Sequence, residues 1–164
     1  MINRATFVFT FSIFLAFTQL TFAQSEDVSS TLEVYKITTN QQGEETAEEV
    51  TTITRGDTLE YQVTYTNNLP NSISNLQPVL PIPTGIEYMA NTAEPEINTA
   101  SLSPSGSNFQ QLPIMREETT ESGLATENEV SAREYRRLRW SVPSLDSQNS
   151  VTVTARVQVI QANR

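Results

Sequence analysis

Lys36 and Asn67 are the two residues whose types and phases predict a specific reaction. Lys36 is the only lysine in the chain, and it shares the phase of Leu32 and Val34 in a strand-like segment. Asn67 ends a second segment, in which it shares the phase of the apolar residues. A lysine and an asparagine that face one core can form an isopeptide bond with loss of ammonia, provided that a buried acid activates the amide.

No acid shares the apolar phase of a strand in this sequence, and this weakens the crosslink hypothesis. The alternative is that Lys36 lies near a strand end, with its aliphatic stem over the core and its ammonium group in water. Both possibilities stay open at the level of sequence.

Two absences limit the remaining chemistry. The chain has no histidine and no cysteine, which excludes serine–histidine triads, histidine zinc sites, thiol nucleophiles and disulfide bonds. The three aspartates are isolated, and the glutamates lie in polar segments without the spacing of a calcium loop or a catalytic carboxylate pair. We therefore expect no enzymatic activity, no catalytic or metal-binding residues and no cofactor.

Three other motifs have both a functional and a structural interpretation. Arg55-Gly56-Asp57 spells an adhesion tripeptide but also suits a turn before a strand. Trp140 suits a sugar platform, although its phase with Leu138 and Val142 favours the core. The remaining motif is a basic cluster that either pairs with neighbouring glutamates or receives an acidic partner; it comprises Arg133, Arg136, Arg137 and Arg139, with Glu127, Glu129 and Glu134 nearby.

The N-terminal residues have the pattern of a signal peptide. Residues 1–4 provide a short basic start, residues 7–17 are apolar and uncharged, and Thr21-Phe22-Ala23 has small residues at the positions that a signal peptidase recognises. We predict cleavage between Ala23 and Gln24. A membrane anchor is the alternative, but polar residues interrupt the apolar run before it reaches the about 20 residues that a span needs.

Signal cleavage would leave an exported chain without a membrane span, in the periplasm, at the cell surface or in the medium. The full chain has a net charge of −9, and cleavage would remove one arginine and no acid. An acidic domain repels phosphate backbones, so we expect no nucleic acid partner.

The rest of the chain is typical of an all-β protein. The clearest strand is LEYQVTYTN, with strict alternation of apolar and polar residues, and VTVTARVQVI repeats that pattern near the end and should be a central strand. Pro81, Pro83 and Gly85 predict a sheet edge or a crossing between sheets. Other strands are expected over residues 31–39, 50–54, 73–80, 86–89, 109–114 and 138–142.

The intervening segments lack this alternation. Residues 40–49 read as an acidic loop, and residues 116–134 as an acidic flexible loop that ends in a helical turn over 131–135. The pattern predicts an immunoglobulin-like β-sandwich of about seven to nine strands over residues 31–164, preceded by a flexible segment over residues 24–30.

Several motifs together resemble a known family. They are GDTLEYQVTYTN (56–67), IPTGIEY (82–88), SGSNFQQLP (105–113), RLRWSVPSL (137–145) and VTVTARVQV (151–159). In this order they resemble the bacterial conserved-repeat family called domain of unknown function eleven. The resemblance implies an immunoglobulin-like module of an exported or cell-surface protein. The chain departs from the family at Leu80, where an aspartate is common, and at Ser147-Gln148-Asn149, where a proline-glycine turn is favoured.

These observations favour a structural or interaction module of the bacterial envelope or surface that contacts another protein, for instance by strand addition. The alternative is a carbohydrate-binding module. An exposed row of aromatic side chains would support that alternative, whereas burial of Tyr61, Tyr65 and Trp140 would argue against it.

Overall fold

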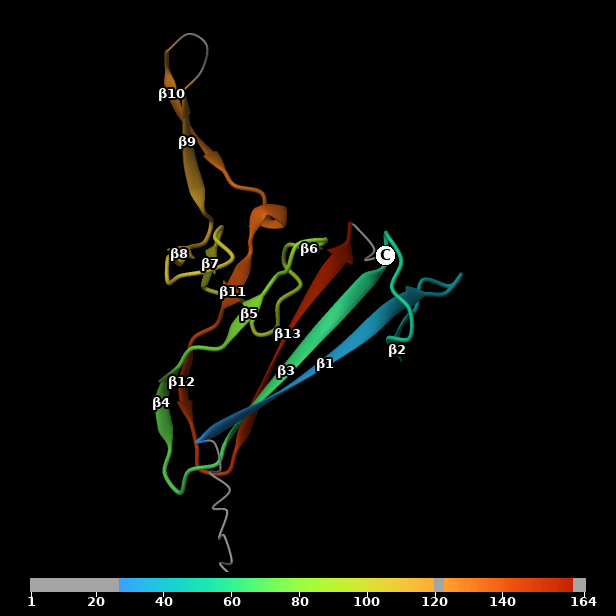
Figure 1. Ribbon diagram of the computed structural model, residues 1–164, viewed down its shortest axis with the longest axis vertical. Coiled ribbons are helices and arrows are strands. Elements are labelled where there is room, and N and C mark those ends of the chain that lie inside the picture. Colours follow the sequence, from blue (N-terminus) through green and yellow to red (C-terminus); the bar gives the residue numbers. More distant parts are fainter. Residues whose placement is uncertain (1–26, 120–122, 161–164) are drawn as a thin grey trace, which may run out of the picture.

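The computed structural model describes residues 27–119 and 123–160, and it confirms the predicted all-β sandwich (Figure 1). The predicted signal peptide over residues 1–23 and its cleavage site at Ala23–Gln24 lie outside the described residues. Within the described part of the chain, no helix is long and apolar enough to cross a membrane.

Thirteen strands and one 3₁₀ helix make up the described structure. Their bounds are β1 Val28–Thr39, β2 Glu45–Glu49, β3 Thr58–Asn67, β4 Ile73–Leu76, β5 Val79–Pro81, β6 Ile86–Tyr88, β7 Thr99–Ser101, β8 Gln110–Gln111, β9 Met115–Thr119, β10 Ala125–Glu129, η1 Ala132–Glu134, β11 Arg137–Arg139, β12 Val142–Leu145 and β13 Ser150–Val159.

The first layer is an antiparallel sheet of five strands in the order β2-β1-β3-β13-β6 (Figure 1). β3 and β13 form its centre, with Leu59 opposite Val157 and Val63 opposite Val153. Alternate residues of an antiparallel pair face the same side, so the apolar residues of both strands point to the core and their threonines point outward. The prediction that residues 151–160 form a central strand is therefore confirmed.

The second layer consists of the sheet β5-β11-β7-β8 and the two-stranded antiparallel sheet β12-β4. Leu80, Ala100 and Leu138 are register partners across this sheet and are all buried. They join residues of the first layer in one hydrophobic core, which also contains Trp140 at 2% exposure. β5 pairs only with β11, so Pro81 lies on an edge strand, as its missing amide donor predicts.

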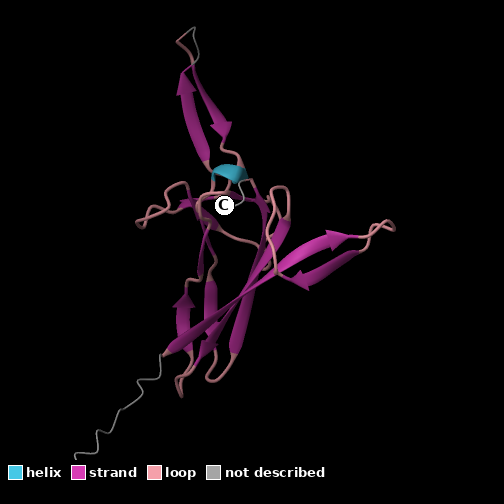
Figure 2. Ribbon diagram, turned by 45° about the vertical axis from the view of Figure 1, so that its right-hand side comes forward, coloured by secondary structure: helices cyan, strands magenta, loops and turns pink. Residues whose placement is uncertain are grey.

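Two hairpins extend from the sandwich, and Figures 1 and 2 show both of them projecting away from its body. One is formed by β2 and the end of β1, and the other by β9 and β10. Every residue of β2, β9 and β10 is exposed. These three strands are stabilised by their ladders and turns rather than by the core.

Several predicted boundaries were wrong, and exposure explains most of the differences. The strand number exceeds the predicted seven to nine for two reasons. The projecting hairpins lack the apolar alternation that marks a half-buried strand. In addition, the predicted strands over 73–80 and 138–142 are each divided in two, and β7 was not predicted. Residues 45–49 form β2, and residues 116–134 contain β9, β10 and η1 instead of a flexible loop. The helical turn at its end is confirmed. Residues 50–54 are not a strand, and β1 begins at Val28, within the segment expected to be flexible.

Asn67 fastens the end of β3 to the loops at that end of the sandwich. Its side chain is 0% exposed. Its Nδ2 donates to the carbonyl oxygens of Asn71, Leu145 and Asp146 at 2.9, 3.0 and 3.2 Å, and its Oδ1 accepts from the Leu69 amide at 3.0 Å. A buried amide with all its groups satisfied specifies one conformation for the chain around it.

We predict that Asn67→Ala lowers the free energy of unfolding by about 1–3 kcal/mol, because it leaves the buried Leu145 carbonyl oxygen and two partly buried carbonyl oxygens without this donor. Urea denaturation measures this loss. The matched control is Asn68→Ala, since the Asn68 side chain is exposed and donates to the Ser29 hydroxyl at 3.1 Å. Equal losses in the two variants would contradict the assigned role of Asn67.

Candidate functional site

The structure does not bring the predicted isopeptide residues together. Lys36 lies opposite Leu59, whereas Asn67 lies opposite Val28 at the other end of the same pair of strands. Eight residues of extended strand separate the two positions, which corresponds to roughly 26 Å. The crosslink hypothesis is therefore wrong for this fold: the apolar phase that the two residues share extends along the full length of the strands.

Lys36 instead pairs with Asp57. Its Nζ lies 2.9 Å from Asp57 Oδ2, and the same oxygen accepts from the Thr54 amide at 2.8 Å and from the Thr54 hydroxyl at 2.9 Å. Gly56 has a φ of +94°, which suits the turn. Arg55-Gly56-Asp57 is thus a turn into β3 whose carboxylate is already engaged, and this structural interpretation is favoured over an adhesion motif.

Hydrogen bonds lower the pKa of Asp57 from 3.8 to about 2, and the bond from Lys36 makes the largest contribution, ahead of those from Thr54. Because the folded pKa lies below the unfolded one, Asp57 contributes stability above about pH 4, and that contribution is lost as the pH falls toward about 2.

We predict that Asp57→Asn destabilises the protein at neutral pH and that the difference in stability between this variant and the wild type shrinks as the pH falls from about 4 to about 2. Urea midpoints from pH 7 to pH 2 measure this, and a constant difference would contradict it.

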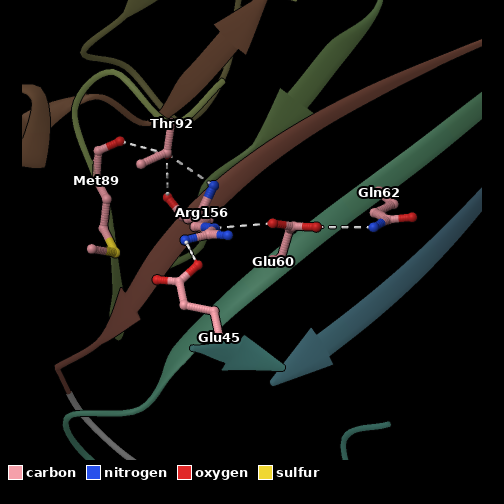
Figure 3. Close-up of polar contacts among 6 residues, drawn as sticks. All are labelled: Glu45, Glu60, Gln62, Met89, Thr92 and Arg156. Carbon is pink, nitrogen blue, oxygen red and sulfur yellow. Dashed lines mark hydrogen bonds and ion pairs between the residues drawn. The ribbon is translucent and has the colours of Figure 1, made fainter. Parts of the chain in front are cut away.

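A second polar cluster links the start of β2 to the centre of the five-stranded sheet. Figure 3 shows Arg156 of β13 between Glu60 of β3 and Glu45 of β2, with ion pairs of 3.0 and 2.8 Å. Burial alone would raise the pKa of Glu60, but hydrogen bonds from Gln62 and Arg156 outweigh it and lower the pKa. The arrangement fixes the position of the β1–β2 hairpin relative to the sheet.

The first half of β1 has one open edge. β3 pairs with β1 over Val28–Ile37, but β2 pairs only with Tyr35–Thr39. Among the described residues, no strand pairs with the other side of residues 28–34. The apolar side chain of Leu32 in this stretch is 55% exposed, although its alternation predicted a place in the core.

The direction of the backbone groups at this edge follows from the ladder. The Asn68 amide donates to the Asp27 carbonyl at 3.0 Å, so the backbone groups of Asp27 point toward β3. These groups alternate along an antiparallel strand. The amides and carbonyls of Val28, Ser30, Leu32 and Val34 therefore point to the open edge, where they can pair with an incoming strand.

A cleft of about 620 Å³ lies between the loop after β6 and the base of the β9–β10 hairpin. Tyr88 and Tyr135 stack in its wall, with ring centroids 6.2 Å apart, and burial raises the pKa of both. Glu94, Glu96 and Glu129 also line it. A cleft that holds two or more glutamates is the arrangement that a carboxylate-based hydrolase would need, although no serine, threonine or lysine lines this one.

Metal-ligating groups and exposed aromatic rings were sought in the described part of the chain. No group of three or more acidic side chains there could hold a metal ion. Every aromatic side chain within residues 27–119 and 123–160 is buried or half-buried, including Tyr61, Tyr65 and Trp140. The Trp140 Nε1 donates to the Pro95 carbonyl at 2.6 Å, which places this ring in the core rather than on a binding surface.

The basic cluster is divided between two surroundings. Arg133 Nε lies 3.8 Å from Glu87, and Glu134 pairs with Arg116 instead of the cluster. Arg137 and Arg139 stack on Phe109. The predicted neutralisation by Glu127, Glu129 and Glu134 is wrong within the described residues, because Glu134 pairs with Arg116 and neither Glu127 nor Glu129 lies within 4.0 Å of a basic group.

Comparison with known proteins gives no relative: no family model matches the chain, and neither a curated protein nor a solved structure is significantly similar to it. The resemblance to the conserved-repeat family stays a prediction, and the function must be inferred from this molecule alone.

Proposed function

We propose that this chain is an exported, non-catalytic interaction module of the bacterial envelope or surface, and that it binds another protein by adding a strand to β1. The observation that carries the proposal is the open edge over Val28–Val34. The predicted signal peptide and the resemblance to a family of exported modules support the location.

The open edge provides main-chain hydrogen-bonding groups for an incoming strand and limits how long that strand can be. Four residues direct their amides and carbonyls outward, and main-chain hydrogen bonds are the source of affinity in strand addition. β2 begins to pair at Tyr35, so an incoming strand can lie beside about seven residues before it meets the end of β2. The exposed Leu32 side chain provides an apolar contact for alternate residues of that strand.

Among the described residues, the edge has little of the usual protection against strand pairing, with Glu33 as its one charged side chain. Natural edge strands are blocked by prolines, lysines, bulges or a covering segment. Residues 28–34 have the sequence VSSTLEV, with neither proline nor lysine. An open strand edge of this kind is a template for pairing with another chain, and it is typical of a site that a specific partner covers.

We predict that Leu32→Lys and Ser30→Pro each reduce partner capture by about tenfold or more, while the fold is retained. Lysine introduces charge at the apolar contact, and proline removes an amide that points to the open edge rather than to β3. Chemical crosslinking in the native host, followed by fractionation and mass spectrometry, measures capture and location together.

The matched control is Ile53→Lys, because Ile53 is also exposed, at 43%, but lies in a loop. It should capture the partner as the wild type does. A wild-type protein recovered without any partner protein, or equal capture by the edge variants, would contradict the proposal.

A further inference from the structure

Arg137 and Arg139 form a fixed pair of guanidinium groups on the outer face of the second sheet. They are two residues apart on β11, so their side chains leave the same face. Their Cζ atoms lie 4.6 and 4.2 Å from the centroid of the Phe109 ring. Arg137 donates to the Gly106 carbonyl, and Arg139 Nε donates to the Thr99 hydroxyl at 2.9 Å. We call the side chains of Arg137, Arg139 and Phe109 the arginine clamp.

The arginine clamp has no acidic partner within the described residues. Lys36, Arg116, Arg133 and Arg156 each lie within 4.0 Å of a carboxylate, whereas Arg55 and Arg136 do not. Arg137 and Arg139 form no such pair, although the chain has 19 acidic residues. Each guanidinium has five N–H donors in a planar fork, so both retain donors for a carboxylate.

The complementary surface lies on the β9–β10 hairpin of the same chain. Glu117 lies directly opposite Glu127, and Glu129 lies opposite Met115, so the three glutamates share one face of the hairpin. None of them lies within 4.0 Å of a basic group among the described residues. Like charges directly opposite each other destabilise a hairpin, and a cationic partner would relieve this repulsion.

We propose that the arginine clamp binds the Glu117–Glu127–Glu129 face of the hairpin of a second copy of this chain. Arg137 and Arg139 are two residues apart on one strand, and so are Glu127 and Glu129, which gives both pairs a spacing of about 6.8 Å. Two carboxylates can therefore meet two guanidinium groups in register. The hairpin projects from the sandwich (Figures 1 and 2), which leaves this face accessible to a neighbour.

The contact joins the basic clamp of one copy to the acidic hairpin face of another. After one contact, the first copy still has a free hairpin face and the second copy still has a free clamp. Such a heterologous contact builds a ring or an open row of molecules rather than a closed twofold dimer. Exposed ion pairs are individually weak and screened by salt. The assembly therefore depends on concentration and forms at low ionic strength. The open edge of β1 does not take part, so this inference is independent of the proposed function.

A charge-exchange experiment tests the inference by sedimentation velocity, with the chain expressed in full so that the host carries out any processing. The wild type should self-associate at about 0.02 M salt and at least about tenfold more weakly at about 0.2 M. R137E/R139E and E127R/E129R should each remain monomeric. An equimolar mixture of the two variants should assemble again, because every contact between a molecule of one variant and a molecule of the other joins opposite charges.

The matched control for the hairpin variant is E49R/E96R, which makes the same change in net charge as that variant, at exposed glutamates without ion pairs in the described residues. It should assemble like the wild type, and so should Leu32→Lys. A monomeric wild type at low salt, an equal loss in E49R/E96R, or two folded variants that do not assemble when mixed would overturn the inference. If either variant does not fold, the salt dependence of the wild type decides.

Discussion

The pairing of β3 with β13 is the constraint on which the rest of the structure depends. These two ten-residue strands form the centre of the larger sheet, and β1 and β6 attach to their outer sides. Their inward residues are the apolar floor on which the second layer packs. The chain has no cysteine, so no disulfide assists this ladder, and hydrophobic burial along it is the main stabilising contribution.

The sequence predicted this centre well because burial of one strand face leaves an alternating pattern. Both long strands, the central place of β13, the turn before β3 and the burial of Trp140 were foreseen on that basis. The projecting hairpins were missed for the same physical reason. β2, β9 and β10 are fully exposed, so no apolar alternation marks them, and their acidic composition resembles that of a loop.

The candidate sites were less predictable, because they depend on register and on coverage. Lys36 and Asn67 share a phase, yet only the pairing of β1 with β3 shows that they lie at opposite ends. The alternation of Leu32 predicts burial, and its exposure arises because nothing among the described residues covers that end of β1. The arginine clamp requires Phe109, which is far from Arg137 in sequence, and no local pattern indicates this contact.

The position of β13 at the end of the described chain has a consequence for the order of folding. Its partner β3 precedes it by about 90 residues, so the central ladder is a contact of large sequence separation, and such topologies fold slowly because a long loop must close first. The central ladder cannot close until β13 is available. For a chain that we propose to be exported, closure of the sandwich therefore waits until β13 has crossed the membrane.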